Sequence, residues 1–348
     1  MAQKMKLKKY LPLFLVAVIF LIIIFQKQLS THLKIALFIT EEFPQIPLKP
    51  LGLLTRSPIR RLVELRSING KIVGDLFISE GRDKKSALIL ATGVKLQDKD
   101  KVILLHLADT LSRLGYVVFW PRLETLDQGI SLPEEPETFI ESFKYLENLK
   151  EVDKEKISFV GFSVGSSTAL VASSDPQISD KVHGLVFFGG YFDVFDYLLS
   201  LATQKMVLNG QVIHWNPSQD ATNHTKALLE AKGAEDIIKI FDQNTSDEMK
   251  AIIFQAPQAE LNRLKKYHPK VHIDKFSAEI FILHDKSDSL VPYVESVKLD
   301  QALSKRGHKI FLLTDLFEHV QPNKPFTNES ILELSKLYGF LYKVFLFL

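Results

Sequence analysis

The residues best suited to do chemistry in this chain are Ser163, Asp288 and His319. A serine hydroxyl becomes a nucleophile when a histidine takes its proton, and a carboxylate orients that histidine and stabilises its charged form. Ser163 lies between Gly161 and Gly165 in the pattern G-x-S-x-G. If the fold brings the three side chains together, this set predicts attack on an acyl carbonyl.

The residues around Ser163 predict a nucleophile elbow. An apolar run at residues 157–162 indicates a buried strand before the serine, and residues 168–172 favour a helix after it. The two glycines leave room for a sharp reversal, in which the serine takes a strained backbone conformation and exposes its hydroxyl at the end of the strand. The strand and helix predicted on either side make this short pattern a specific indication of a nucleophile elbow.

With this elbow, the chain resembles the α/β-hydrolase superfamily from about residue 60 onward. The resemblance implies an α/β fold in which a mostly parallel, doubly wound sheet has helices on both faces, with serine, acid and histidine in that chain order. On the elbow alone, the alternative is a flavodoxin-like or other doubly wound domain whose glycine-rich turn binds a ligand without cleaving it.

The resemblance assigns the acid to Asp288. A predicted strand at residues 279–284 opens into a stretch that often reads His-Gly-x-x-Asp-x-x-Val-Pro in the resembled family. The matching positions here are His284, Asp288, Val291 and Pro292. Asp285 stands where glycine is usual, and it is one alternative acid; Asp193, after the preceding strand, is the other.

The general base is predicted to be His319. It follows the last predicted strand, residues 309–314, and in the resembled fold this loop arcs back over the elbow. His284 and His106 fall in a predicted strand and a predicted helix, and we interpret both as structural.

The oxyanion hole is predicted from main-chain N–H groups. A buried strand at residues 86–91 ends in Thr92, Gly93 and Val94, where the resembled family commonly has His-Gly-x. The resemblance assigns one donor to Val94 and the other to Val164, after the serine. A triad of this kind requires no metal or cofactor.

The amino terminus predicts a membrane anchor. Four lysines within residues 1–9 precede residues 10–25, which carry no charge. This run favours an uncleaved transmembrane helix, with a cleaved signal peptide and a buried core helix as alternatives. Because lysines cluster before the run, we expect a cytoplasmic amino terminus and an extracytoplasmic catalytic domain.

The predicted organisation has three parts. Residues 1–29 form the tail and transmembrane anchor, residues 30–58 a proline-rich linker without a long helix, and residues 59–348 the hydrolase domain. A helical insertion at about residues 191–271 is expected to be either a lid over the sheet edge or an ordinary helical excursion. The carboxyl-terminal residues 337–348 are expected to pack on the sheet.

Strand and helix patterns alternate along the rest of the domain. The dipeptide Asn69-Gly70 between two alternating runs predicts an opening hairpin. The other expected elements are helices at residues 100–114 and 136–149 and strands at residues 116–121 and 182–188.

The charge balance and the lack of cysteine exclude some kinds of partner and site. With 43 Lys and Arg against 41 Asp and Glu and no dense basic tract in the domain, no nucleic-acid partner is expected. The chain has no cysteine and therefore no disulfide or thiolate site.

We expect a membrane-anchored serine hydrolase that cleaves carboxylic ester-like bonds, lipid-like ones included. A thioesterase, peptidase or acyltransferase with the same triad is an alternative, as is a non-catalytic binding protein.

Overall fold

An eight-stranded sheet organises the chain in the computed structural model, which describes residues 26–67, 70–93, 98–123, 135–219, 221–223, 262, 265–266, 268–304, 307, 309–322, 324–328 and 330–348. The strands lie in the order β1-β2-β4-β3-β5-β6-β9-β10. Their bounds are β1 (Ile59–Ser67), β2 (Gly70–Ile78), β3 (Lys85–Ala91), β4 (Val117–Arg122), β5 (Val152–Phe162), β6 (Gly184–Phe188), β9 (Glu279–Asp285) and β10 (Lys309–Thr314).

The sheet is mostly parallel, as predicted. β1 pairs with β2, and β2 with β4, in antiparallel fashion, so the predicted opening hairpin is confirmed. The pairs from β4 through β3, β5, β6 and β9 to β10 are all parallel. The carboxyl ends of these strands therefore lie along one edge of the sheet.

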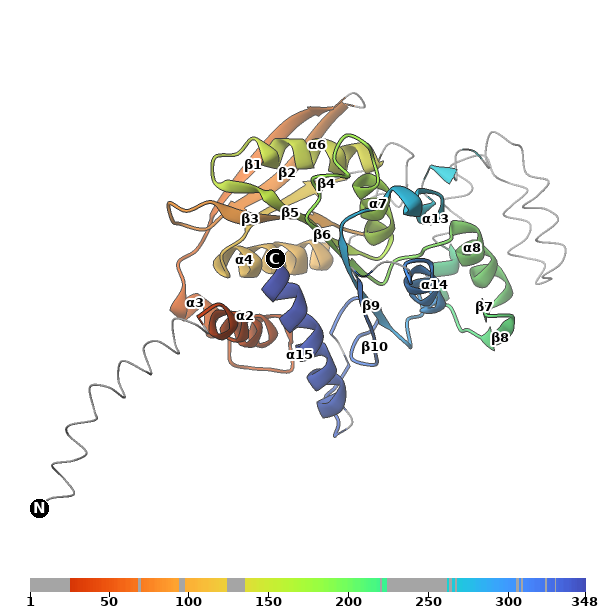
Figure 1. The fold of residues 1–348 in the computed structure, drawn as a ribbon. Coiled ribbons are helices and arrows are strands. Elements are labelled where there is room, and N and C mark those ends of the chain that lie inside the picture. The colour runs from red at the N-terminus through yellow and green to blue at the C-terminus, as the bar shows by residue number, and fades with distance from the viewer. Residues whose placement is uncertain are drawn as a thin grey trace, which may run out of the picture.

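Helices cover both faces of the sheet (Figure 1). Their bounds are α2 (Gln26–Glu42), α3 (Leu51–Leu54), α4 (Asp98–Arg113), α6 (Glu135–Glu147), α7 (Val164–Ser173), α8 (Val194–Thr203), α13 (Pro269–His272), α14 (Val294–Ala302) and α15 (Ser330–Phe347). α6 and α7 pack on one face, and α2, α4 and α15 pack on the other. This arrangement is the doubly wound α/β fold predicted from the sequence.

The central strands are apolar on both sides because both faces are covered. In β3, Ile89 packs with the core under α6 and α7, whereas Leu88 and Leu90 pack with the core under α4. All three side chains are fully buried. This explains why these strands read as continuous apolar runs rather than as alternating ones.

The amino-terminal segment differs from the predicted linker. The expected transmembrane residues 10–25 lie outside the described residues, and no helix within the described ranges has both the length and the apolarity needed to cross a bilayer. The expectation that residues 30–58 hold no long helix is wrong, since α2 runs from Gln26 to Glu42. The reason is positional: every proline of this segment follows Glu42, so none interrupts the helix.

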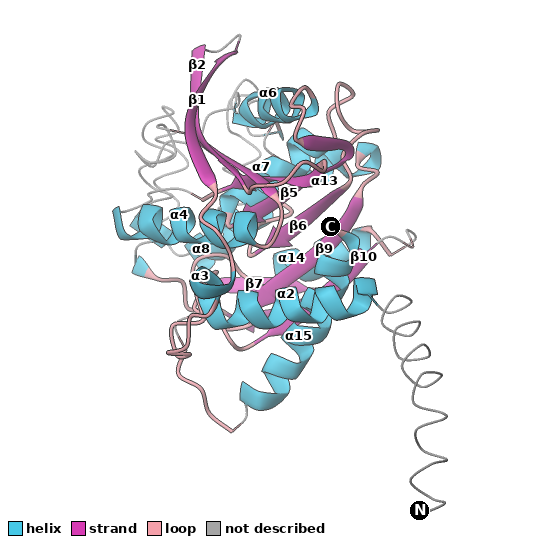
Figure 2. Ribbon diagram, turned by 90° about the vertical axis from the view of Figure 1, so that its left-hand side faces the viewer, coloured by secondary structure: helices cyan, strands magenta, loops and turns pink. Residues whose placement is uncertain are grey.

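α2 is part of the domain. Ile35 of α2 is fully buried, and the rings of His32 and Phe38 contact Tyr342 and Phe345 of α15. The two helices lie side by side (Figure 2). α15 in turn packs Leu337 and other apolar side chains against the sheet, which confirms the packing expected for the carboxyl terminus.

The described part of the insertion contains a hairpin that the sequence analysis did not predict. After α8, strands β7 (Lys205–Leu208) and β8 (Gln211–His214) pair across Asn209 and Gly210, which both have positive φ. The Asn-Gly dipeptide is the signal that could have indicated it. The helical pieces expected at residues 225–232, 235–241 and 246–254 lie outside the described residues.

Replacing Phe159 should test the core under α6 and α7. Its fully buried ring contacts the rings of Phe139 and Phe143, at centroid distances of 6.3 and 6.2 Å. We expect Phe159→Ala to lower the free energy of unfolding by about 3–5 kcal/mol, measured by urea unfolding, because a cavity is left. The exposed control Val102→Ala should change it by less than about 0.5 kcal/mol. Equal effects of the two substitutions would contradict this packing.

Candidate active site

Ser163 occupies the turn between β5 and α7 in a strained backbone conformation. Its φ of 54° and ψ of −134° lie outside the regions that residues with a side chain normally adopt. Its amide donates a hydrogen bond of 2.8 Å to the carbonyl of Phe188 at the end of β6. The strand, sharp turn and helix predicted around Ser163 are therefore present.

The two glycines of the elbow are required by close packing. A Cβ atom at Gly165 would lie 2.3 Å from the carbonyl oxygen of Ala91, and one at Gly161 would lie 2.5 Å from Cα of Ser166. Either contact would force the backbone apart. The start of α7 therefore packs closely against the end of β3. Just after β3, a Cβ atom at Gly93 would lie 3.4 Å from the Ser163 hydroxyl oxygen.

Asp288 lies in the loop after β9, with 2% of its surface exposed. One carboxylate oxygen accepts the backbone N–H groups of Leu290 and Val291, at 2.7 and 2.9 Å. The other lies 2.6 Å from Nδ1 of His319. This is the acid–base contact that the resemblance assigned to Asp288 and His319.

His319 is the first residue of the two-residue loop in a tight hairpin that follows β10. Glu318 and Gln321 exchange both backbone hydrogen bonds, and His319 has a φ of 60°. Positive φ at this position is typical of the tight turns that close such hairpins. The loop thereby turns the imidazole back toward the end of β9. Nε2 of His319 is buried and has no hydrogen-bond partner within the described ranges.

Gly189 lies next to His319 and directly follows the residue that binds the Ser163 amide. Gly189 follows Phe188, which binds the Ser163 amide, and a Cβ there would lie 3.5 Å from Cε1 of His319. No hydrogen bond joins the serine hydroxyl to His319 in the described part of the chain. Such a bond is often long before substrate binds.

His284 is a second histidine at Asp288. Its Nε2 lies 3.2 Å from the carboxylate oxygen that also contacts His319, and its Nδ1 lies 2.6 Å from the hydroxyl of Ser296. The contact of His284 with Asp288 is not predicted from the sequence, which indicates only a structural histidine in a strand. The available signal was its position four residues before Asp288, at the end of β9.

These contacts set the charge state of Asp288. Burial by itself would raise the pKa of the Asp288 carboxyl, but the charge of His319 and hydrogen bonds from His284 and His319 outweigh burial and hold this pKa below its usual range. Asp288 is therefore ionised at neutral pH and can stabilise a positive charge on His319.

Neither alternative aspartate contacts His319. Asp285 is fully buried and binds the backbone N–H of Phe317 and the ammonium of Lys324, both at 2.8 Å. Asp193 caps the start of α8 and binds Lys270 at 2.8 Å. Each carboxylate is engaged elsewhere, and Asp288 is the one of the three that contacts His319.

The insertion helps to hold the loop of Asp288. The indole N–H of Trp215 donates to the backbone carbonyl of Asp288 at 2.8 Å, and the hydroxyl of Tyr197 donates to that of Leu290 at 3.2 Å. Trp215 is buried. Part of the predicted insertion thus supports the Asp288 loop, a role that no sequence pattern indicated.

One of the two predicted oxyanion donors can be placed. Val164 is the first residue of α7, where a backbone N–H has no acceptor within the helix and lies at the positive end of the helix dipole. Such a group can bind a developing oxyanion beside Ser163. Val94 lies outside the described residues.

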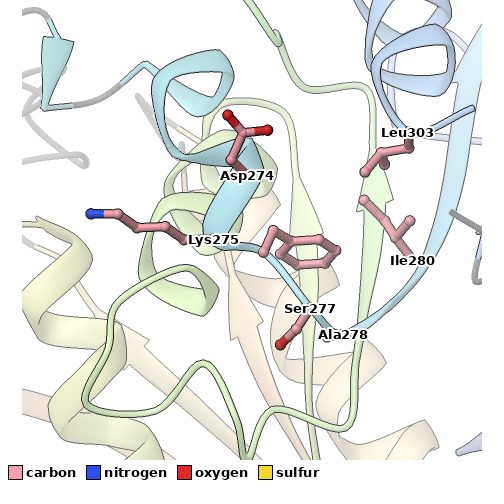
Figure 3. Close-up of a pocket in the computed structure, with 7 residues that line it drawn as sticks. Asp274, Lys275, Ser277, Ala278, Ile280 and Leu303 are labelled. Atoms are coloured by element: carbon pink, nitrogen blue, oxygen red, sulfur yellow. The ribbon is translucent and has the colours of Figure 1, made fainter. Parts of the chain in front are cut away.

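A pocket of about 320 Å³ lies away from this site. Ile280 and Leu303 face each other in its wall (Figure 3). Since Ile280 is at the amino end of β9, the pocket opens at the edge of the sheet opposite Ser163.

Within the described ranges, no group of three acidic, histidine or cysteine side chains gathers as a metal site would require.

Comparisons with known proteins agree with this fold. The sequence model of the BD-FAE family matches residues 144–303, a stretch that includes Ser163 and Asp288. No curated protein sequence matches the chain.

Several solved structures are similar in fold. Acylaminoacyl peptidase of Pyrococcus horikoshii is 13% identical with a TM-score of 0.55, over 85% of this chain and 42% of that protein. A puromycin-hydrolyzing peptidase of Mycobacterium tuberculosis is 12% identical with a TM-score of 0.55, over 86% and 39%. 2,6-Dihydroxy-pseudo-oxynicotine hydrolase is 16% identical with a TM-score of 0.53, over 83% and 68%.

These likenesses confirm the α/β-hydrolase fold indicated by the sequence. The chain spans about two fifths of the length of the two peptidases.

Acid unfolding should report the lowered pKa of Asp288. Below the ordinary aspartate pKa of about 3.9, the unfolded chain binds a proton at this residue and the folded chain does not. The stability contributed by the carboxylate is therefore full above that pH and is lost as pH falls toward the lower pKa of the folded state. Between about pH 4 and pH 2, wild type should lose up to about 1.4 kcal/mol more per pH unit than Asp288→Asn.

Urea unfolding at a series of pH values measures both slopes. Val102→Ala, at an exposed position that holds no titratable group, is the control and should keep the wild-type slope. Equal slopes for wild type and Asp288→Asn would contradict the assignment.

Proposed function

We propose that this chain, which has the α/β-hydrolase fold, is a serine hydrolase that cleaves carboxylic ester-like bonds. The observation that carries the proposal is the 2.6 Å contact between Asp288 and His319, at the same edge of the sheet as the strained Ser163. The three residues follow three separate strands, β5, β9 and β10, whose carboxyl ends lie along one edge of the sheet. His319 is paired with a buried carboxylate, and its Nε2 has no hydrogen-bond partner in the described ranges. This nitrogen can therefore accept a proton.

The proposed reaction proceeds in two steps. Nε2 of His319 takes the proton of Ser163 as its hydroxyl attacks the carbonyl carbon, and the Val164 amide, with that of Val94, binds the oxyanion. His319 then gives the proton to the departing alcohol, and an acyl group remains on Ser163. Water attacks this acyl-enzyme with His319 again as the base, and the acid is released. Asp288 fixes the orientation of His319 throughout.

Peptide or amide bonds are the second candidate substrate class. Two of the similar structures are named as peptidases, and the same groups can expel an amine in place of an alcohol. Thioester cleavage and acyl transfer use the same acyl-enzyme. The size and shape of the acyl pocket would decide among these substrates.

We also propose that residues 10–25 anchor the enzyme in a membrane with its amino terminus in the cytoplasm. The uncharged run after four lysines supports this, and α2 begins directly after it. A lipid-like ester would then be presented beside the catalytic domain.

Ser163→Ala should abolish catalysis. With p-nitrophenyl esters of graded acyl length, we expect kcat/KM to fall at least about 1000-fold, because the nucleophile is lost. A fluorophosphonate probe should label wild type and the exposed control Ser304→Ala, but not Ser163→Ala. Equal labelling of all three, or none with folded protein, would favour a non-catalytic binding protein. Faster cleavage of aminoacyl p-nitroanilides than of every ester would favour the peptidase.

The anchor can be tested by fractionation without detergent. Full-length protein should sediment with membranes, and a chain that lacks residues 1–25 should be released, since its apolar run is gone. Protease added to intact cells should degrade the catalytic domain if it lies outside the cytoplasm. Recovery of the full-length chain in the soluble fraction would refute the anchor.

A further inference from the structure

The loop that carries His319 must be held by its surroundings. His319 has a φ of 60°, and strained conformations persist only where neighbouring contacts determine them. We call residues 315–324 the base loop. Its contacts come from two sides, one inside the domain and one from the amino-terminal segment.

The inner contact is Asp285. Its two carboxylate oxygens bind the N–H of Phe317 and the ammonium of Lys324, each at 2.8 Å. These partners lie two residues before and five residues after His319. Asp285 therefore links the two ends of the base loop on either side of His319 in the sequence.

The outer contact comes from residues 43–45, which we call the strap. The side-chain amide nitrogen of Gln45 donates to the carbonyl oxygens of Pro322 and Lys324, at 2.6 and 2.7 Å. Phe43 is buried, and its ring centroid lies 6.1 Å from that of Phe317. The strap thus touches the base loop on both sides of His319.

The strap is itself fixed at the end of α2. The ammonium of Lys49 donates to the carbonyls of Thr40, Glu41 and Phe43, at 2.7, 3.0 and 3.0 Å. The carboxylate of Glu41 accepts the N–H of Leu51 at 2.8 Å, and this caps the start of α3. These bonds close the turn independently of the base loop, so the turn can act as a support for it.

We propose that the strap positions His319 for catalysis, so that the amino-terminal segment is part of the catalytic unit rather than a tether to it. The proposal rests on the proposed function of His319 as the general base. Gln45 and Phe43 are positioning residues, since they act through the base loop and touch no reacting atom. When the strap is lost, the base loop keeps Asp285 but loses its outer support, and Nε2 of His319 moves relative to the hydroxyl of Ser163.

The test compares substitutions of Gln45 in the full-length chain. Gln45→Ala removes both hydrogen bonds, and Gln45→Glu keeps the size of the side chain but removes the donor. We expect kcat on a p-nitrophenyl ester to fall about 10-fold or more in both variants, with KM within about twofold, because small misplacement of a reacting group slows turnover. Gln301→Ala, at an exposed glutamine remote from the base loop, is the matched control and should keep the wild-type kcat.

Two further readouts separate positioning from stability. Fluorophosphonate labelling taken to completion counts the folded sites, so that kcat is expressed per active site. Hydrogen exchange should become faster at the Phe317 amide in both Gln45 variants and stay unchanged in β5. Unchanged kcat per site, or a lower melting temperature as the sole effect, would overturn the proposal.

The failure of the two proposals can be distinguished. If wild type is not labelled, the proposed function fails and the strap's catalytic role fails with it. If wild type is labelled and turns over, but the Gln45 variants match it in kcat and in Phe317 exchange, the hydrolase stands and the strap is refuted.

Discussion

The 2.6 Å contact between Asp288 and His319 is the interaction on which the geometry of this site depends, because it joins loops that leave two different strands. A carboxylate buried to this extent remains charged only if donors surround it. Two backbone N–H groups and two histidines do so here. The resulting fixed negative charge in a water-poor environment is the condition under which a histidine can carry a positive charge during acyl transfer. The neighbouring features of the fold keep this pair in place.

Two of the residues with positive φ are those to which we assign the proton transfer. Ser163 and His319 both have positive φ, and conformations of this kind cost about 1–3 kcal/mol each. At Ser163, the cost is offset by glycines that admit close packing and by a hydrogen bond to β6. At His319, a tight hairpin and the contacts of Asp285 do the same for the base loop.

Segments outside the sheet stabilise the two loops of the acid–base pair. Trp215 and Tyr197, from the insertion after β6, bind backbone carbonyls of the acid's loop. Gln45, from the amino-terminal segment, binds carbonyls of the base loop. The central sheet sets where the strands end, but these additions determine how firmly each loop is held. The sheet therefore positions the strand ends of the site, and the insertion after β6 and the amino-terminal segment hold its two loops.

The sequence by itself determined the elements that depend on local patterns: the apolar runs of the strands, the Asn-Gly hairpin and the elbow around Ser163. It also indicated Asp288 and His319 as the candidate acid and base. Residues 10–25 remain a prediction from sequence, since they lie outside the described residues. Only the tertiary structure decided that Asp288, rather than Asp285 or Asp193, meets His319, that His284 shares its carboxylate, and that Gln45 reaches the base loop. Those contacts join residues 4 to 279 positions apart, and no periodicity or turn signal encodes which side chains will meet across such loops. The physical reason is that local propensity fixes where a strand ends, whereas packing between strands and segments fixes which polar groups are buried together.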